Sequence, residues 1–113
     1  MTHKVFLANI DFTDLEYKSC KMEDGNFVVY LNYCNGKILR LIFFNVIQFS
    51  YKLGSSVSHI YEITAKNPIL DEALSFWYVK VPSDHPYKLF QIIDIEDFPF
   101  IEVVAERAEV VKD

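Results

Sequence analysis

The sequence predicts a mostly β fold, an antiparallel β-barrel or sandwich of about six to eight strands with one short helix near residues 68–76. Runs rich in Tyr, Phe, Val and Ile alternate with turn dipeptides, which is typical of strands joined by hairpins. Only one segment combines a capping residue, a proline and apolar residues at helical spacing. The hydrophobic fraction of 51% is enough for one core, and no repeat or linker divides the chain. Residues 1–113 are therefore expected to form a single domain.

Two turn dipeptides predict the first hairpins. Asp24-Gly25 joins the expected strands Leu15–Met22 and Phe27–Tyr33, and Asn35-Gly36 joins the second of these to Lys37–Phe49. Both dipeptides favour the positive φ angles of two-residue turns. The second turn predicts three cross-strand pairs on one face: Val29 with Ile42, Tyr33 with Ile38 and Phe27 with Phe44. The opposite face then pairs Val28 with Phe43, Tyr30 with Leu41 and Asn32 with Leu39. Because neither face is polar, we expect interior strands that are covered on both sides.

The expected helix lies in NPILDEALSF. Asn67 is a good N-cap, Pro68 suits the first helical position, and Asp71 and Glu72 lie near the positive end of the helix dipole. Apolar residues fall on one side at helical spacing. We expect a helix from Pro68 to about Phe76 that covers one apolar face of the central strands.

Both cysteines are expected to be free thiols. The predicted turns place Cys20 opposite Val29 and Cys34 opposite Lys37, so the two side chains point to opposite faces of the sheet. A one-residue slip of the first turn still leaves the cysteines about 13 Å apart along the strand, beyond the roughly 7 Å that a disulfide allows between Cα atoms. Free thiols are typical of a reducing compartment.

The C-terminal half contributes further strands. Trp77–Val81 and Tyr87–Ile95 are expected on either side of the loop PSDHP, and EDFP turns the chain into Phe100–Ala105. A four-residue loop there predicts two cross-strand pairs, Ile92 with Val103 and Phe90 with Ala105. Residues 105–113 favour a continued strand, although Ala-Glu-Arg-Ala is also compatible with a helix.

Charge excludes several classes of partner. The formal net charge is -5 and the sequence pI is near 5.1. Nucleic acids and anionic membranes bind through Lys and Arg, and no cluster of these residues offsets the acidic balance. The most hydrophobic stretch, LRLIFFNVIQF, is interrupted by polar residues and far shorter than a membrane span. We therefore expect a cytoplasmic protein that contacts neither nucleic acid nor membrane.

The sequence contains no recognisable catalytic motif. Asp84-His85 is the most enzyme-like pair, but turns also favour such residues, and no nucleophile motif accompanies it. The three histidines lack the spacing of metal ligands, and the isolated glycines do not form a phosphate-binding loop. We therefore expect no enzyme activity, no metal and no cofactor. The acidic stretch DIEDFPFIE is expected to be a solvated hairpin tip.

Aromatic and acidic residues near the loops are the candidate binding residues, since Trp and Tyr at strand ends are common interface anchors. They are Trp77, Tyr78, Asp84, His85, Tyr87, Asp97 and Phe98. They favour a non-enzymatic protein-interaction module, of the inhibitor or immunity type, that recognises a basic partner. Three alternatives stay open: a β-barrel that binds a small apolar ligand, a structural homodimer subunit, and a hydrolase or isomerase built on Asp84, His85 and a distant residue.

Overall fold

A computed structural model describes residues 3–5, 15–33, 36–54 and 56–112. The described part contains one helix, α1 (Pro68–Trp77). The strands of the described part are β1 (His3–Val5), β2 (Glu16–Glu23), β3 (Asn26–Tyr33), β4 (Lys37–Phe44), β5 (Gln48–Tyr51), β6 (Val57–Ile63), β7 (Lys88–Asp94), β8 (Pro99–Ala105) and β9 (Arg107–Lys112).

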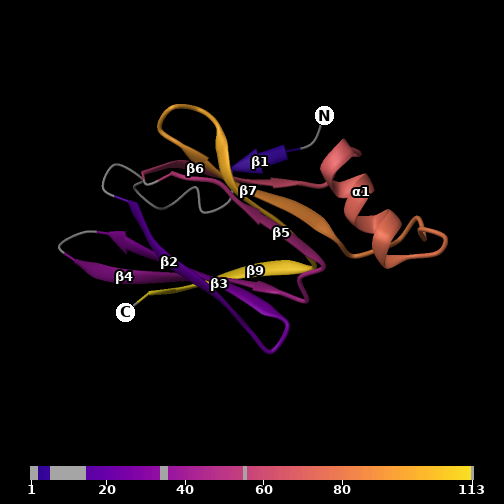
Figure 1. The fold of residues 1–113 in the computed structure, drawn as a ribbon, viewed down its shortest axis with the longest axis horizontal. Helices are drawn as coiled ribbons and strands as arrows, with labels where there is room; N and C mark the ends of the chain where they lie inside the picture. Colours follow the sequence, from indigo (N-terminus) through magenta and orange to yellow (C-terminus); the bar gives the residue numbers. More distant parts are fainter. Residues whose placement is uncertain (1–2, 6–14, 34–35, 55, 113) are drawn as a thin grey trace.

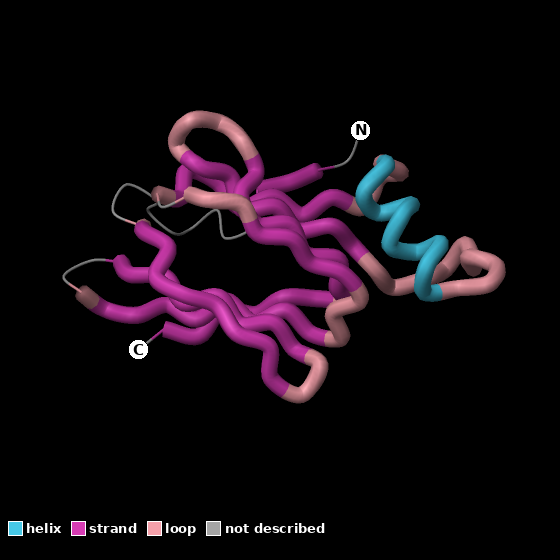
Figure 2. Tube along the Cα trace, in the orientation of Figure 1, coloured by secondary structure: helices cyan, strands magenta, loops and turns pink. Residues whose placement is uncertain are grey.

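Two antiparallel sheets form a sandwich, which confirms the predicted fold class (Figure 1). One sheet has the order β1-β6-β7-β8-β5, and the other has the order β2-β3-β4-β9. Figure 2 shows the two layers of strands, with the helix at one end of the upper layer. The sheets enclose a core in which the Phe43 and Phe90 rings, one from each sheet, have centroids 5.2 Å apart. The largest buried side chains between the sheets include Phe27, Leu31, Leu39, Leu41, Ile60, Ile92 and Ile101.

Two chain segments cross from one sheet to the other. The predicted strand Lys37–Phe49 is divided into β4 and β5 by a bend at Asn45, whose φ is 56°. Beside it, β8 passes into β9 at Glu106. The two bends are held together by the Glu106 N–H, which donates to Phe44 O at 3.0 Å, and by the Ile47 N–H, which donates to Val104 O at 3.0 Å. This division of one expected strand into two contributes to a total of nine strands in the described part, one more than the upper end of the predicted range.

The first hairpin has the predicted register. Asp24 and Gly25 both have positive φ, and Cys20 lies opposite Val29 as expected. Cys20 is a free thiol whose Sγ accepts a hydrogen bond from the Tyr17 hydroxyl at 3.3 Å. The expectation for Cys34 falls outside the described residues.

The second hairpin has a different register, and the predicted pairs are wrong by one residue. Val29 lies opposite Leu41, Val28 opposite Ile42 and Phe27 opposite Phe43. Tyr33 pairs with Lys37, so three residues rather than two separate the strands, and Gly36 has a φ of 78°. A three-residue loop with a left-handed glycine is the next most common hairpin connection. The inner face therefore carries Phe27, Val29 and Leu31 with Leu39, Leu41 and Phe43.

The hairpin between β7 and β8 is shifted by two residues from the prediction. Phe90 lies opposite Val103 and Ile92 opposite Ile101, with a bulge between Ile92 and Ile93. Because side chains alternate with a period of two, this shift leaves every residue on its predicted face. Phe90, Ile92 and Val103 all face the core, as expected.

The helix forms where it was predicted and ends one residue later, but the surface that it covers was predicted wrongly. The Asn67 side chain accepts a hydrogen bond from the Leu70 N–H at 2.9 Å and caps the helix. Leu70 and Leu74 pack on Leu89 and Val104, on the outer face of the five-stranded sheet. Strands β3 and β4 belong to the other sheet, whose outer face is partly shielded by long charged side chains (Lys21 and Arg107).

The structure differs from the prediction at Trp77–Val81 and agrees with the predicted strand character of the C-terminal tail. Trp77–Val81 is not a strand, because Trp77 ends the helix and a loop continues from Tyr78 to Tyr87. The segment therefore joins a helix to a strand rather than two strands. In contrast, the tail forms strand β9, which confirms its predicted strand character, although the bend at Glu106 places it in the other sheet beside β4.

Candidate functional site

The predicted binding residues fall into two groups at opposite ends of β7. Trp77, Tyr78, Asp84, His85 and Tyr87 lie before β7, near the end of α1. Asp97 and Phe98 lie in the turn that joins β7 to β8, and Figure 1 shows this turn well apart from α1. A strand of this length separates the two groups by roughly 20 Å. They do not form one site.

Asp84 and His85 take part in a turn. The His85 N–H donates to Pro82 O at 3.4 Å, and His85 Nδ1 accepts the Tyr87 N–H at 3.2 Å. The Asp84 side chain is exposed to solvent. With Nδ1 used as an acceptor from the main chain, the imidazole has no hydrogen bond to Asp84 of the kind that orients a catalytic histidine.

The turn after β7 is ordered by its own acidic residues. Asp94 is buried, and its Oδ1 accepts the Glu96 N–H at 2.9 Å. The Asp97 N–H donates to Asp94 O at 2.8 Å, and Asp97 adopts a φ of 67°. Glu96 and Asp97 are exposed, as expected for a solvated hairpin tip, while Asp94 is not. We assign these residues a structural role in the turn.

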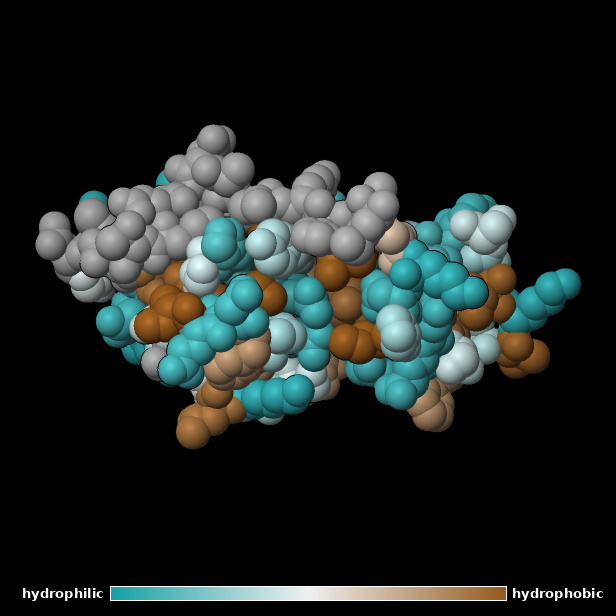
Figure 3. All heavy atoms as spheres, turned by 90° about the horizontal axis from the view of Figure 1, so that it is seen from above, coloured by the Kyte–Doolittle hydropathy of each residue, from teal (hydrophilic) through white to brown (hydrophobic). Residues whose placement is uncertain are grey.

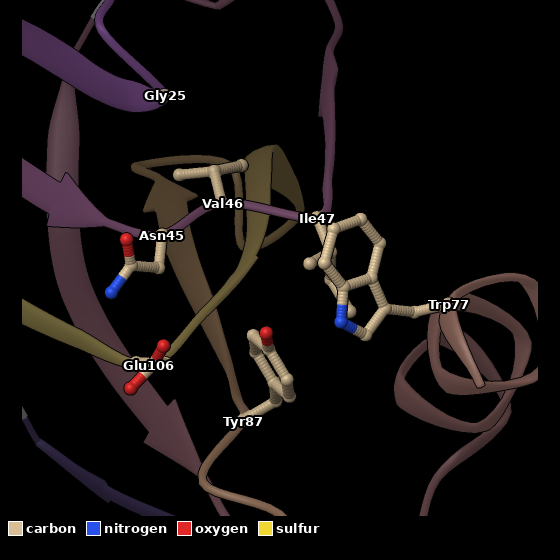
Figure 4. Close-up of a pocket in the computed structure, with 7 residues that line it drawn as sticks. All are labelled: Gly25, Asn45, Val46, Ile47, Trp77, Tyr87 and Glu106. Carbon is tan, nitrogen blue, oxygen red and sulfur yellow. The ribbon is translucent and has the colours of Figure 1, made fainter. Parts of the chain in front are cut away.

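Among the described residues, a groove at the other end of β7 is a candidate site that contains two of the predicted binding residues. It has a volume of about 360 Å³ and is open to solvent on one side. Trp77 and Tyr87 line it together with residues from both sheet crossings. The complete lining consists of Gly25, Asn45, Val46, Ile47, Trp77, Tyr87 and Glu106 (Figure 4).

The fold positions each wall of the groove separately. Trp77 is the last residue of α1, and its side chain is 58% exposed although the helix is anchored by buried leucines. Tyr87 is buried immediately before β7. On the opposite wall, the Val46 N–H donates to Gly25 O at 3.2 Å, and the Asn45 N–H donates to Asn26 Oδ1 at 3.3 Å. In Figure 4, Trp77 and Ile47 lie at one side of the view, Asn45 and Glu106 at the other, and the Tyr87 hydroxyl between them.

The polar groups of the groove favour a positively charged ligand. Burial is the main cause of a raised pKa at the Tyr87 hydroxyl, followed by the neighbouring Tyr78 and Glu106, while a hydrogen bond with Trp77 acts in the opposite direction. Glu106 provides the carboxylate of the lining, and no cationic side chain lies among the described lining residues. Lys88, a nearby cation, donates to the main-chain oxygen of Glu106 at 2.8 Å. The groove therefore combines a carboxylate with aromatic and aliphatic walls.

The sequence identified only part of this site. Trp77 and Tyr87 were predicted, whereas Asn45, Val46, Ile47 and Glu106 were not. A signal did exist, since Asn45 interrupts the apolar run LRLIFFNVI and Glu106 interrupts FIEVVAERA. Both residues mark the bends at which the chain leaves one sheet for the other. Nothing in the sequence places these bends beside the end of the helix.

Other surfaces of the described residues offer weaker sites. The outer face of the five-stranded sheet has a polar pair, in which Nε2 of the half-buried Gln91 donates to Oε2 of the buried Glu102 at 2.8 Å. His59 is exposed and interacts with its neighbour Ser58 through Nδ1 at 2.8 Å. No group of three or more His, Cys, Asp or Glu side chains within the described ranges is placed to hold a metal ion. Outside the grey atoms, Figure 3 shows hydrophobic residues in separate groups among hydrophilic ones.

Comparisons with known proteins give no relative from which a function could be transferred: no protein family, curated protein or solved structure matches the chain. No helix among the described residues is long and apolar enough to cross a membrane.

Proposed function

We propose that the protein is a non-enzymatic interaction module that binds a basic protein partner through the groove between Trp77 and Glu106. The observation that carries this proposal is the composition of the groove, which joins an exposed indole, a buried tyrosine and a carboxylate with no cation in the described lining. An inhibitor or immunity-type protein, which covers a basic site on its target, is the functional class that such a surface suits.

The groove fits a Lys or Arg side chain of the partner. Cations are attracted to the faces of Trp and Tyr rings, and the aliphatic stem of a Lys or Arg can pack on apolar walls such as Val46 and Ile47. Glu106 then provides the opposite charge at the far side of the groove. Arginine suits this arrangement especially well, because its planar guanidinium both stacks on aromatic rings and forms two hydrogen bonds to a carboxylate.

The single tryptophan makes the proposal directly testable, since Trp77 fluorescence reports on the groove alone. Arginine-rich, lysine-rich and acidic peptides of equal length are titrated into the protein. We expect the basic peptides to shift the emission in a saturable way and the acidic peptide to have no effect. Glu106→Gln should weaken binding several-fold, because it removes the carboxylate without changing the size of the side chain.

Glu109→Gln is the matched control, since it makes the same chemical change on β9, where Glu109 pairs with Arg107 outside the groove lining. Salt provides a second measurement. Raising the salt concentration from about 50 to about 500 mM should slow association several-fold and change dissociation less, because exposed charges mainly accelerate encounter. Equal affinities of the two Gln variants, together with an association rate that does not depend on salt, would overturn the proposal.

A further inference from the structure

In the part of the chain that the structure describes, the four edges of the two sheets differ in how they are protected against pairing with another strand. Charged residues and bulges commonly protect exposed edges. Strand β2 has four charged residues and a bulge between Tyr17 and Ser19, and β9 carries Arg107, Glu109 and Lys112. The described edge β1 has only three residues, including a lysine. Strand β5, with the sequence QFSY, has no charged residue and no bulge in its register with β8.

Among the described residues, no strand pairs with the outer side of β5, which is the last strand in the order of its sheet. The Lys52 N–H donates to Phe100 O at 2.7 Å, so Lys52 and Phe100 form a hydrogen-bonded pair beside β8. Because such pairs recur every second residue in an antiparallel ladder, Ser50 and Gln48 also bond to β8. The N–H and C=O groups of Phe49 and Tyr51 therefore point away from β8 toward the free edge.

The side chains of the same two residues are exposed but held in place. Phe49 and Tyr51 are each 44% exposed. The Phe49 ring stacks on the buried Phe27 ring with centroids 4.5 Å apart, and the Tyr51 ring lies 5.3 Å from that of Tyr17. Leu53, which follows closely in the chain, is 89% exposed. An approaching strand would therefore meet preorganised apolar side chains beside unpaired main-chain groups.

We infer that a second copy of this chain pairs with β5, so that the two β5 strands lie antiparallel about a two-fold axis at Ser50. In this register Phe49 of each copy lies opposite Tyr51 of the other, and each of these pairs exchanges two main-chain hydrogen bonds. Lys52 lies opposite Gln48 rather than opposite another charge. For a chain with a net charge of -5, β5 itself therefore brings no carboxylate to the contact between two copies. The proposed groove for a basic partner lies next to this contact, because Ile47 of its lining immediately precedes β5.

Sedimentation equilibrium over a wide concentration range tests the pairing. We expect the wild type to dimerise and Ser50→Lys to raise the dimer dissociation constant at least about tenfold, because it places two like charges opposite each other. Ser83→Lys is the matched control, since it makes the same charge change in an exposed loop and should dimerise like the wild type. Circular dichroism verifies that both variants are folded.

A crosslink gives an independent test. Residues at the axis form a non-hydrogen-bonded pair with Cα atoms about 4.5 Å apart, a distance that a disulfide can bridge. Ser50→Cys should therefore form a covalent dimer under oxidising conditions, whereas the wild type and Ser83→Cys should not. A wild type that stays monomeric at all concentrations, or a Ser50→Lys variant that dimerises as well as Ser83→Lys, would overturn the inference.

Discussion

The apolar side chains on the outer faces of the two sheets are covered in different ways. Both carry apolar side chains that the core does not bury. On the five-stranded sheet, α1 covers Leu89 and Val104 with Leu70 and Leu74, and all four side chains are almost completely buried. On the four-stranded sheet, the Arg107 guanidinium lies 3.9 Å from the centroid of the Phe44 ring, and Lys21 Nζ lies 5.9 Å from that of Tyr30.

This difference shows that long charged side chains can cover apolar surface that the single described helix does not contact. A packed helix removes water from the contact, so each of its buried side chains contributes strongly to stability. A long charged side chain covers a ring with its stem and keeps its charge in water, which contributes less but also keeps the surface soluble. We expect substitutions under the helix to have larger effects than substitutions on the four-stranded sheet.

The largest effect is expected at the centre of the helix contact. Leu74→Ala should lower the free energy of unfolding by about 2–5 kcal/mol, because it leaves a cavity above the five-stranded sheet. Phe76→Ala on the same helix is the control, since the Phe76 side chain is 84% exposed and should change stability little. Urea denaturation of both variants measures the difference. Similar losses would show that the helix is not anchored by its buried face.

The helix cap should have a smaller effect. Asn67→Ala removes the acceptor of the Leu70 N–H and should cost about 1 kcal/mol. Asn67→Asp keeps an acceptor at the same place and should retain most of the stability. Thermal unfolding of the two variants compares them, and an equal loss in both would contradict the capping role.

A still smaller effect is expected on the four-stranded sheet. Arg107→Ala removes the cation over Phe44 and the ion pair with Glu109, both at the surface, and should cost less than about 1 kcal/mol. Glu109→Ala removes only the ion pair, so the difference between these variants isolates the contact with the ring. If Arg107→Ala destabilises the protein as much as Leu74→Ala, the contrast between the two faces is wrong.

The smallest effect on stability is expected at alkaline pH. Burial raises the pKa of Tyr87 above its ordinary value, so the folded state favours the neutral phenol. This contribution is complete below the ordinary tyrosine pKa of about 10 and is lost as pH rises through the folded-state pKa. Stability should therefore decline above about pH 10, and Tyr87→Phe should make the decline shallower. Denaturation midpoints of the wild type and of Tyr87→Phe, measured across this pH range, test this prediction. Tyr17, whose pKa is raised by burial and by Cys20, accounts for part of the remaining decline.

Hairpin registers show how far local chemistry determines this fold. Asp24-Gly25 specifies its own turn, and the register that it implies is the one observed. Asn35-Gly36 has the same kind of sequence, but the chain places three residues between Tyr33 and Lys37. The observed register lets Phe27 and Phe43 face the core together, and packing against the other sheet selects it. A shift of one residue exchanges the faces of a strand, whereas the two-residue shift at β7 and β8 leaves the faces unchanged.

The groove likewise shows that the sequence predicts only some of the residues that tertiary structure brings together in a site. Sequence reasoning predicted Trp77 and Tyr87 because aromatic residues near loops are common binding anchors. It also grouped them with Asp97 and Phe98, which lie close in sequence but at the other end of β7. The acidic residue that actually lies in the groove with Trp77 is Glu106, and it arrives there because β8 bends into β9.

The sequence by itself determined the β-rich class, the position and cap of the helix and the first turn, and it favoured a strand in the tail, because each depends on neighbouring residues. Tertiary structure alone decided which sheet the helix covers, where Lys37–Phe49 divides, and which residues meet in the groove. The physical reason is that both faces of β3 and β4 are apolar, so the pattern of hydrophobic residues does not say which face is buried between the sheets. Only the packing of the second sheet and of α1 distinguishes the two faces.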